Sequence, residues 1–266
     1  MCIICRKENL EGLTKLYCSN CTSLTSLPEL PQSLVKLYCY DCTSLKSLPK
    51  LPQGLTVLSC SGCTSLISLP KLPQGLTVLS CSGCTSLTSL LSNNSVELPQ
   101  SLTRLYCYNC TSLTSLPNLP QSLTGLFCSG CTSLKFLPKL PQSLTELYCS
   151  RCNSLTSLPN LPQILTELYC SSCPSLTSLP ELPQNLTYLD CSNCFLLLSL
   201  PKLTEILSCK KCPWLNHSQN PDFQTNLSKL KTIQRFSKKY SFKRKLNHLY
   251  HLKHYFPKDI SKMIIS

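Results

Sequence analysis

The chain has 266 residues, of which only 14% are charged, while 22 are Cys, 20 are Pro and one is Trp. This length allows one or two ordinary globular domains, but such a biased composition points first to internal repeats. The net charge of +13 lies at one end: residues 1–200 carry 11 Lys/Arg against 9 Asp/Glu, and residues 201–266 carry 14 against 3. The nearly neutral first 200 residues argue against nucleic acid as a partner of that region.

The first residues do not follow the pattern of a signal peptide. Met-Cys-Ile-Ile-Cys-Arg-Lys places its charges after a very short apolar run, which is the reverse of the usual order. The longest apolar run, Phe195 to Leu198, is too short to span a bilayer. We therefore expect a cytoplasmic protein with no membrane contact, with the nucleus as the alternative location and with its thiols reduced.

One unit is repeated along most of the chain. Residues 34–54 read LVKLYCYDCTSLKSLPKLPQG, and residues 144–164 read LTELYCSRCNSLTSLPNLPQI. The first Cys of each pair recurs every 21 residues from Cys18 to Cys191, apart from one step of 26 caused by a loop insertion within Leu91–Val96. A final Cys pair follows after a shorter step of 18 residues.

The spacing divides the chain into three parts. A degenerate half-coil covers residues 1–9, ten coils cover residues 10–215, and a basic segment covers residues 216–266. A single coil cannot bury its own apolar side, so the coils must stack on one another to form a continuous core.

Two segments of each coil have a predictable backbone. Residues 36–40, Lys-Leu-Tyr-Cys-Tyr, alternate so that Leu37 and Cys39 share one face, which predicts a short strand. Stacked coils would pair these strands into a parallel sheet on the concave side. The Leu-Pro-x-Leu-Pro segment holds two prolines three residues apart, which favours polyproline II over helix on the convex side.

This unit, L-x-x-L-x-C-x-x-C-x-x-L-x-x-L-P-x-L-P, resembles the leucine-rich-repeat family over residues 10–215. Its Leu-Pro-x-Leu-Pro half is similar to the short coils of bacterial secreted effectors, and its regular Cys-x-x-Cys pairs with a basic tail are similar to repeat proteins of giant viruses. The resemblance implies an α/β leucine-rich-repeat solenoid that binds other proteins, with a viral or effector-type role toward a host as one form of that function. In that case the expected location is the host cytoplasm.

All 22 cysteines lie in Cys-x-x-Cys pairs. Two such pairs at a suitable spacing can form a zinc site. The repeat offers a simpler interpretation, because the first Cys occupies an inward strand position and the second lies where the family commonly has Asn or Cys at the turn. We therefore predict reduced core thiols, no metal and no cofactor. A metal-thiolate or redox role for the stacked thiols is the alternative.

The residue before each first Cys points away from the core. Six of these ten positions are aromatic, and we call them the aromatic column: Tyr17, Tyr38, Tyr106, Phe127, Tyr148 and Tyr169. The other four are Ser59, Ser80, Asp190 and Ser208. Aromatic side chains provide large contact areas at low entropy cost, so we predict that this concave face binds a partner. Tyr also forms strands well and stacks on its own copy, so the column can equally be structural.

Basic residues and apolar residues alternate with helical spacing in the last segment. Asn220-Pro221-Asp222 is typical of a helix start, and the apolar stripe that follows predicts an amphipathic helix that caps the last coil. Part of it resembles the IQ motif bound by calmodulin, and the Phe256-Pro257 region resembles the start of an F-box that recruits a ubiquitin ligase. The candidate binding residues of this tail are Ile233, Gln234, Lys238, Lys239, Lys243, Arg244 and Lys245.

No combination of side chains suggests catalysis. The Ser residues are copies of the repeat without a nearby base, and no Cys follows Cys212. We therefore predict a non-catalytic protein–protein interaction module.

Overall fold

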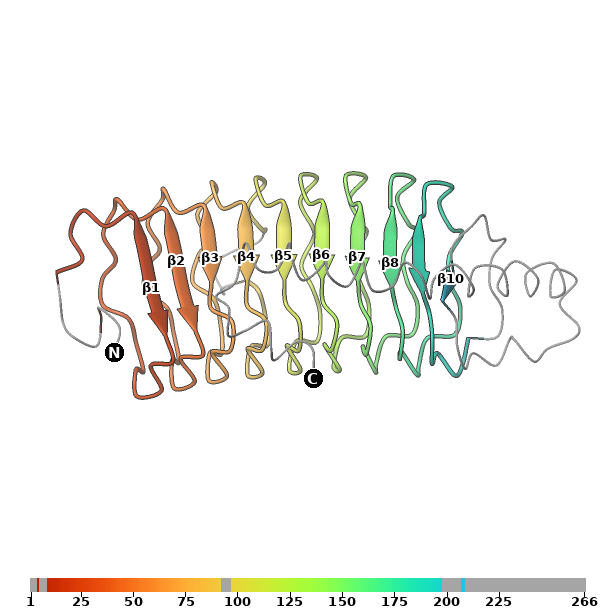
Figure 1. The fold of residues 1–266 in the computed structure, drawn as a ribbon, viewed down its shortest axis with the longest axis horizontal. Helices are drawn as coiled ribbons and strands as arrows, with labels where there is room; N and C mark the ends of the chain where they lie inside the picture. Colours follow the sequence, from red (N-terminus) through yellow and green to blue (C-terminus); the bar gives the residue numbers. More distant parts are fainter. Residues whose placement is uncertain (1–3, 5–8, 92–96, 198–206, 209–266) are drawn as a thin grey trace, which may run out of the picture.

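The structure is a computed structural model that describes residues 4, 9–91, 97–197 and 207–208. Ten strands form one parallel sheet in which every strand lies next to its neighbour in the sequence (Figure 1). The strands are β1 (Lys15–Ser19), β2 (Lys36–Tyr40), β3 (Val57–Ser59), β4 (Val78–Ser80), β5 (Arg104–Tyr106), β6 (Gly125–Phe127), β7 (Glu146–Tyr148), β8 (Glu167–Tyr169), β9 (Tyr188–Asp190) and β10 (Leu207–Ser208).

Each strand pairs with the equivalent residues of the next coil. Lys36 of β2 pairs with Val57 of β3, a step of 21 residues, whereas Val78 of β4 pairs with Arg104 of β5, a step of 26. The five extra residues between β4 and β5 therefore leave the register of the sheet unchanged. Identical residue types can then stack on one another along most of the sheet.

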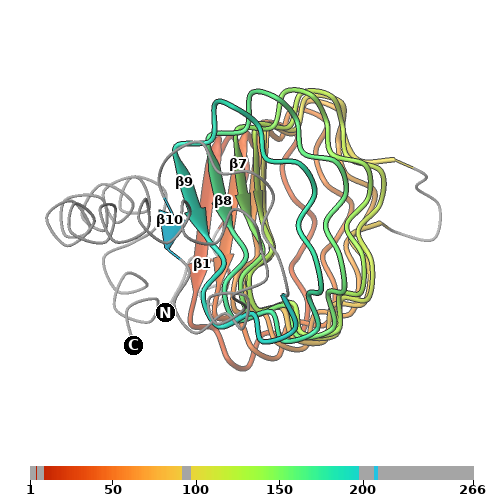
Figure 2. The ribbon, with the colours of Figure 1, turned by 90° about the vertical axis from the view of Figure 1, so that its right-hand side faces the viewer.

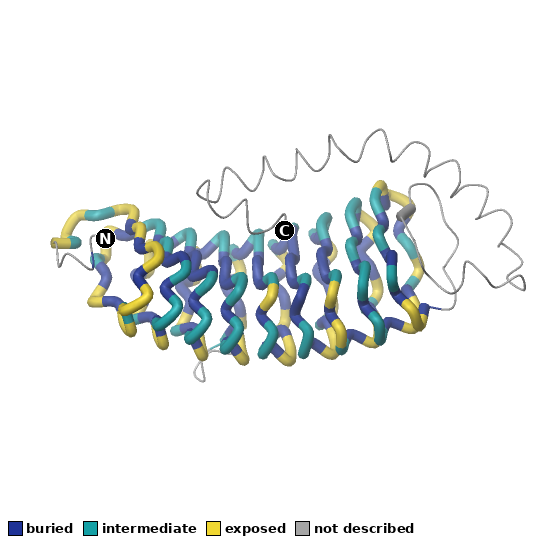
Figure 3. Tube along the Cα trace, turned by 60° about the horizontal axis from the view of Figure 1, so that its bottom comes forward, coloured by how far each residue is buried: buried dark blue, intermediate teal, exposed yellow. Residues whose placement is uncertain are grey.

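The core lies between the sheet and the opposite side of each coil. The strand prediction is confirmed in β1 and β2, where Leu16, Cys18, Leu37 and Cys39 are all buried. Burying a Leu side chain contributes roughly 1.5–3 kcal/mol, and the repeat places several in every coil. In Figure 3 buried positions recur in every described coil, which is the pattern expected of a continuous core.

The side of the coil opposite the sheet is extended rather than helical. Figure 2 shows the strands on one side of the solenoid and irregular backbone on the other. No helix occurs among the residues that the structure describes, and two parallel bridges, Ser26 to Ser47 and Ser68 to Ser89, link neighbouring coils there. The prolines explain this backbone, because they lack an N–H donor. The chain is therefore a solenoid of leucine-rich coils with a parallel sheet on one side and an extended outer side, as predicted.

The turn after each strand from β1 to β9 requires a left-handed backbone. The third residue of nine described Cys-x-x-Cys motifs has a positive φ: Asn20, Asp41, Gly62, Gly83, Asn109, Gly130, Arg151, Ser172 and Asn193. Gly, Asn and Asp adopt this conformation at low cost, which explains seven of the nine choices. Arg151 (φ 58°) and Ser172 (φ 57°) are the two exceptions.

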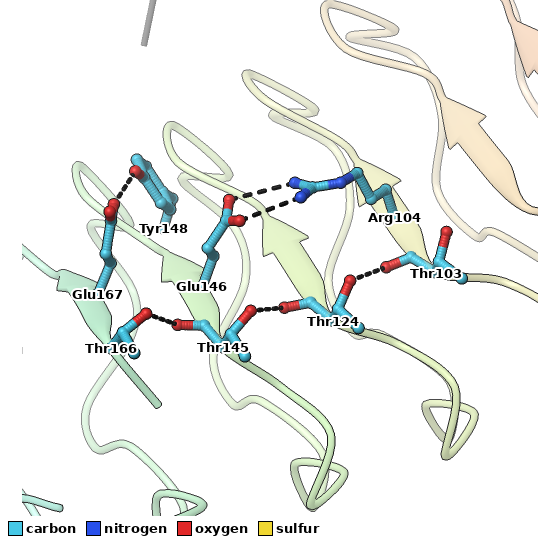
Figure 4. A network of polar contacts seen from close by, with 8 residues as sticks. All are labelled: Thr103, Arg104, Thr124, Thr145, Glu146, Tyr148, Thr166 and Glu167. Carbon is cyan, nitrogen blue, oxygen red and sulfur yellow. Dashed lines mark hydrogen bonds and ion pairs between the residues drawn. The ribbon is translucent and has the colours of Figure 1, made fainter. Parts of the chain in front are cut away.

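A threonine directly precedes each strand from β3 to β9 and ties neighbouring coils together. The hydroxyl groups of Thr124, Thr145 and Thr166 each donate to the backbone carbonyl of the equivalent Thr in the preceding coil, at 3.1, 3.1 and 3.0 Å (Figure 4). The same carbonyls accept backbone N–H bonds, as when Thr103 accepts from Thr124 at 2.9 Å. These bonds fix the distance between strands beside the face that carries the aromatic column.

Candidate functional site

The aromatic column lies along one face of the sheet, which we call the sheet face. Register pairs Tyr17 with Tyr38 at one end, and Tyr106, Phe127, Tyr148 and Tyr169 in succession further along. Because strands in a sheet are about 4.8 Å apart, equivalent rings in consecutive coils are brought into stacking distance.

The rings stack in two groups. Tyr17 and Tyr38 form the first, with centroids 4.8 Å apart and ring planes only 6° from parallel. In the second, Tyr106 stacks on Phe127 at 4.5 Å, Phe127 lies tilted against Tyr148 at 5.0 Å, and Tyr148 stacks on Tyr169 at 4.2 Å. Such contacts contribute about 0.5–1.5 kcal/mol each beyond their buried area.

Stacking changes how much of the column is accessible. Tyr17, which has a neighbour on one side, is 55% exposed, but Phe127 is only 2% exposed, and Tyr106 and Tyr148 are also buried. Each ring in the second group covers the faces of its neighbours, and Tyr108 packs beside Phe127 at 5.9 Å. Tyr106, Phe127 and Tyr148 thus lie apart from the core of the solenoid, but their contacts with one another bury them.

The column also contains a residue that the sequence reasoning missed. Tyr188 stacks on Tyr169 with centroids 4.4 Å apart, although the position in register with Tyr169 is Asp190. Tyr188 occupies the flanking position, two residues before Asp190, and its ring extends the stack by one coil. An aromatic residue at either outward strand position is the signal that would have identified it.

A hollow separates the two groups of rings. It is lined by Tyr38 and Tyr40 on one side and Tyr106 on the other, with Ser59, Ser80, Val57 and Val78 between them. Ser61 and Ser80 share a hydrogen bond at 2.8 Å, which secures the polar floor. Because Ser59 and Ser80 stand at the column position of β3 and β4, the stack of rings is interrupted over these two coils.

Charged residues flank the second group of rings. The guanidinium of Arg104 donates two hydrogen bonds to the carboxylate of Glu146, at 3.1 and 3.2 Å, and lies 5.8 Å from the centre of the Phe127 ring. The hydroxyl of Tyr148 donates to the carboxylate of Glu167 at 2.5 Å (Figure 4). On this face Arg104 and Glu146 thus form an ion pair.

From Cys42 to Cys194, the second Cys of each pair has a carbonyl partner in the preceding coil. The thiols of Cys131, Cys152, Cys173 and Cys194 donate to the backbone carbonyl of the first Cys one coil earlier, at 3.0–3.2 Å. No disulfide joins the cysteines that the structure describes. These contacts need a protonated thiol, as reduced core cysteines would provide.

The surroundings of the inner thiols favour the protonated form. Contact with the thiol of Cys131, and then burial, raises the pKa of Cys107 well above its usual range, and burial raises the pKa of Cys149. Cys42 is the exception, because contacts with the thiols of Cys18 and Cys63 lower its pKa to about 3. The thiols near the first coils thus differ from those in the middle of the solenoid.

The candidate residues of the tail lie outside the described part of the chain, and they stay sequence-based predictions: Ile233, Gln234, Lys238, Lys239, Lys243, Arg244 and Lys245. Over the residues that the structure does describe, no helix has the length and apolar character needed to cross a membrane.

No protein-family model and no curated protein matches the sequence. Among solved structures, the chain is similar to YopM, a leucine-rich effector protein from Yersinia pestis, at 29% identity over 77% of this chain and 72% of YopM, with a TM-score of 0.48. It is also similar to a leucine-rich repeat protein from Bacteroides ovatus, at 20% identity over 74% of this chain and 59% of that protein, with a TM-score of 0.46. A third similar structure is CroV588, a circular leucine-rich-repeat protein, at 23% identity over 68% of this chain and 40% of CroV588, with a TM-score of 0.26.

Proposed function

We propose that this protein is a non-catalytic interaction module that binds a protein partner on its sheet face. The observation that carries the proposal is the hollow between Tyr38 and Tyr106, which has aromatic walls and a serine floor. A side chain of the partner lies over this interruption and packs against Tyr38 and Tyr106 on either side of it. Preorganised aromatic side chains bind with little further loss of entropy.

The cysteines support the non-catalytic part of the proposal. A nucleophilic Cys needs an accessible thiolate. The described thiols in the middle of the solenoid are buried and donate to backbone carbonyls, as Cys152 does to Cys128. These thiols act in packing the coils rather than in attacking a substrate.

The first test is to fill the hollow. In the full chain, Ser59→Tyr with Ser80→Tyr adds the two absent rings, and the pair Tyr17 and Tyr38 shows that adjacent coils accept stacked rings at this position. Because Ser59 and Ser80 are themselves buried, the urea midpoint is measured first, and a variant that keeps the wild-type midpoint is expected to lose its partners in affinity purification from the native cell. An unchanged set of partners would contradict the proposal.

The second test removes the rings instead. Tyr106, Phe127, Tyr148 and Tyr169 are all replaced by Ser, the residue that β3 and β4 carry at the equivalent position. The matched control replaces three exposed apolar residues outside the strands, Ile67, Phe136 and Ile164, by Ser. We expect the column variant to lose its partners and the control to keep them.

A viral or effector-type role toward a host is the finer form of this proposal. It is supported by the resemblance of the Cys-x-x-Cys coils to repeat proteins of that kind. Identifying a partner that belongs to another organism is the result that would support it.

A further inference from the structure

Three thiols lie together near the beginning of the solenoid. The Sγ atoms of Cys18, Cys21 and Cys42 are all within 4.8 Å of one another, and all three side chains are buried. Cys18 belongs to β1, Cys21 to the turn after β1, and Cys42 to the turn after β2. Among the residues that the structure describes, no other three possible metal ligands approach one another so closely.

This cluster departs from the thiol pattern of the later coils. The thiol of Cys63 lies 3.3 Å from the Cys39 carbonyl, and those of Cys84 and Cys131 lie 3.1 and 3.0 Å from their acceptors. Cys42 is 3.6 Å from the Cys18 carbonyl, and its sulfur lies 3.7 Å from the sulfur of Cys18.

The strands of the first two coils are also longer than the later ones. β1 and β2 pair over five residues, so Cys18 pairs with Cys39 inside the ladder, whereas the strands from β3 to β9 are three residues long and end before the Cys. The thiol of Cys42 approaches the thiol of Cys18 and lies further from its carbonyl acceptor than the thiols of the later coils do.

The geometry points to a zinc site, and we propose that Cys18, Cys21 and Cys42 bind one zinc ion through their thiolates. In a tetrahedral site with Zn–S bonds of about 2.3 Å, the sulfur atoms are about 3.8 Å apart. Cys18 and Cys42 already have this separation, at 3.7 Å. Two ligands come from one Cys-x-x-Cys turn, as in structural zinc sites, and the third comes from the next coil.

Thiolate ligands suit a soft or borderline cation rather than magnesium or calcium. A zinc ion here would link the coils of β1 and β2. Coils near the end of a solenoid have fewer neighbours to stabilise them, so a link is useful there. Cys21 is 7% exposed whereas Cys18 and Cys42 are fully buried, so the site is reached from the side of Cys21.

The experiment uses the full chain, purified under reducing conditions and then loaded with Co²⁺ as a spectroscopic substitute for zinc. We expect thiolate-to-cobalt charge-transfer bands and the visible bands of a tetrahedral site, both displaced by one equivalent of Zn²⁺. The test variant is Cys21→Ser, which changes the most accessible ligand. Its matched control is Cys152→Ser, the same repeat position in the middle of the solenoid.

We expect Cys21→Ser to weaken Co²⁺ binding at least tenfold and Cys152→Ser to leave it unchanged, with urea midpoints confirming that both variants fold. The proposal is overturned if the wild type shows no thiolate–cobalt bands. It is also overturned if Cys21→Ser binds as tightly as the wild type, or if thiol titration and mass spectrometry of the reduced protein find a Cys18–Cys42 disulfide.

Discussion

Arg104 and Glu146 form a two-bond ion pair across an intervening strand. They lie on β5 and β7, and the residue between them on β6 is Gly125, which has no side chain to separate them. Both side chains are about one-third exposed, at 32% and 27%. Solvent therefore weakens the attraction, and we expect the pair to contribute no more than about 1 kcal/mol.

A double-mutant cycle measures this contribution. Arg104→Met, Glu146→Gln and the combined variant are compared by urea unfolding. The expected coupling free energy is about 0.3–1 kcal/mol, decreasing at high salt. A coupling above about 2 kcal/mol would mean that the pair is better shielded from solvent than its exposure indicates.

Gly125 is predicted to tolerate no side chain. A Cβ atom at this position would lie 2.6 Å from Cε2 of Phe127 and 3.2 Å from Nη1 of Arg104. We expect Gly125→Ala to lower the free energy of unfolding by about 1–3 kcal/mol, because a packed ring must move. The control is Gly54→Ala, where the nearest atom is a carbonyl oxygen 4.0 Å away, and we expect no loss of stability there.

Arg151 stands where most coils have Gly, Asn or Asp. Its φ of 58° places a long side chain in the left-handed region, which costs an L-residue about 1–2 kcal/mol. Gly does not have this steric cost, but it loses more backbone entropy on folding, which offsets part of the gain. We therefore expect Arg151→Gly to stabilise the protein by about 0.5–1 kcal/mol. Arg151→Ala keeps the same penalty, so an equal gain from both variants would rule out backbone strain as the cause.

The thiol of Cys152 is predicted to stabilise the stack by donating to the Cys128 carbonyl at 3.2 Å. Cys152→Ala removes the side-chain donor, although the same carbonyl still accepts the backbone N–H of Cys131 at 3.3 Å, while Cys152→Ser keeps a hydroxyl donor. We expect the Ala variant to be less stable than the Ser variant by about 1 kcal/mol in urea unfolding. Equal midpoints would show that the S–H bond adds nothing to packing.

Alkaline pH is expected to destabilise the solenoid. The pKa values of Cys107, Cys128 and Cys149 are raised in the folded protein from an ordinary value of 9.0. The contribution of these protonated thiols to stability is complete below pH 9 and is lost above it, because the unfolded chain then releases protons that the folded chain keeps. Each such thiol removes about 1.4 kcal/mol per pH unit.

Urea midpoints measured from pH 7.5 to pH 10.5 in the presence of a reducing agent check this expectation. The midpoint should be flat up to about pH 8.5 and should then fall. Buried tyrosines act in the same direction, since burial raises the pKa of Tyr108. A midpoint that stays constant to pH 10 would contradict the assignment of these groups.

The sequence by itself determined the repeat, the strands and the extended outer side. Alternation at Leu37 and Cys39 requires one buried face, and two prolines per coil exclude a helix, so both results follow from local chemistry. Recurrence every 21 residues predicts the solenoid, because a coil that cannot bury its own apolar side must stack on its neighbours. The inward position of the first Cys followed from the same pattern.

Only the tertiary structure decided how the outward residues are used. Distances between coils depend on register and on which neighbours are small, so the burial of Phe127, the reach of Arg104 across Gly125 and the addition of Tyr188 to the column were not visible in one repeat. The same holds for the thiols. Identical Cys-x-x-Cys motifs differ in their contacts, since the sulfur of Cys42 lies 3.7 Å from that of Cys18 whereas the thiol of Cys131 lies 3.0 Å from a carbonyl.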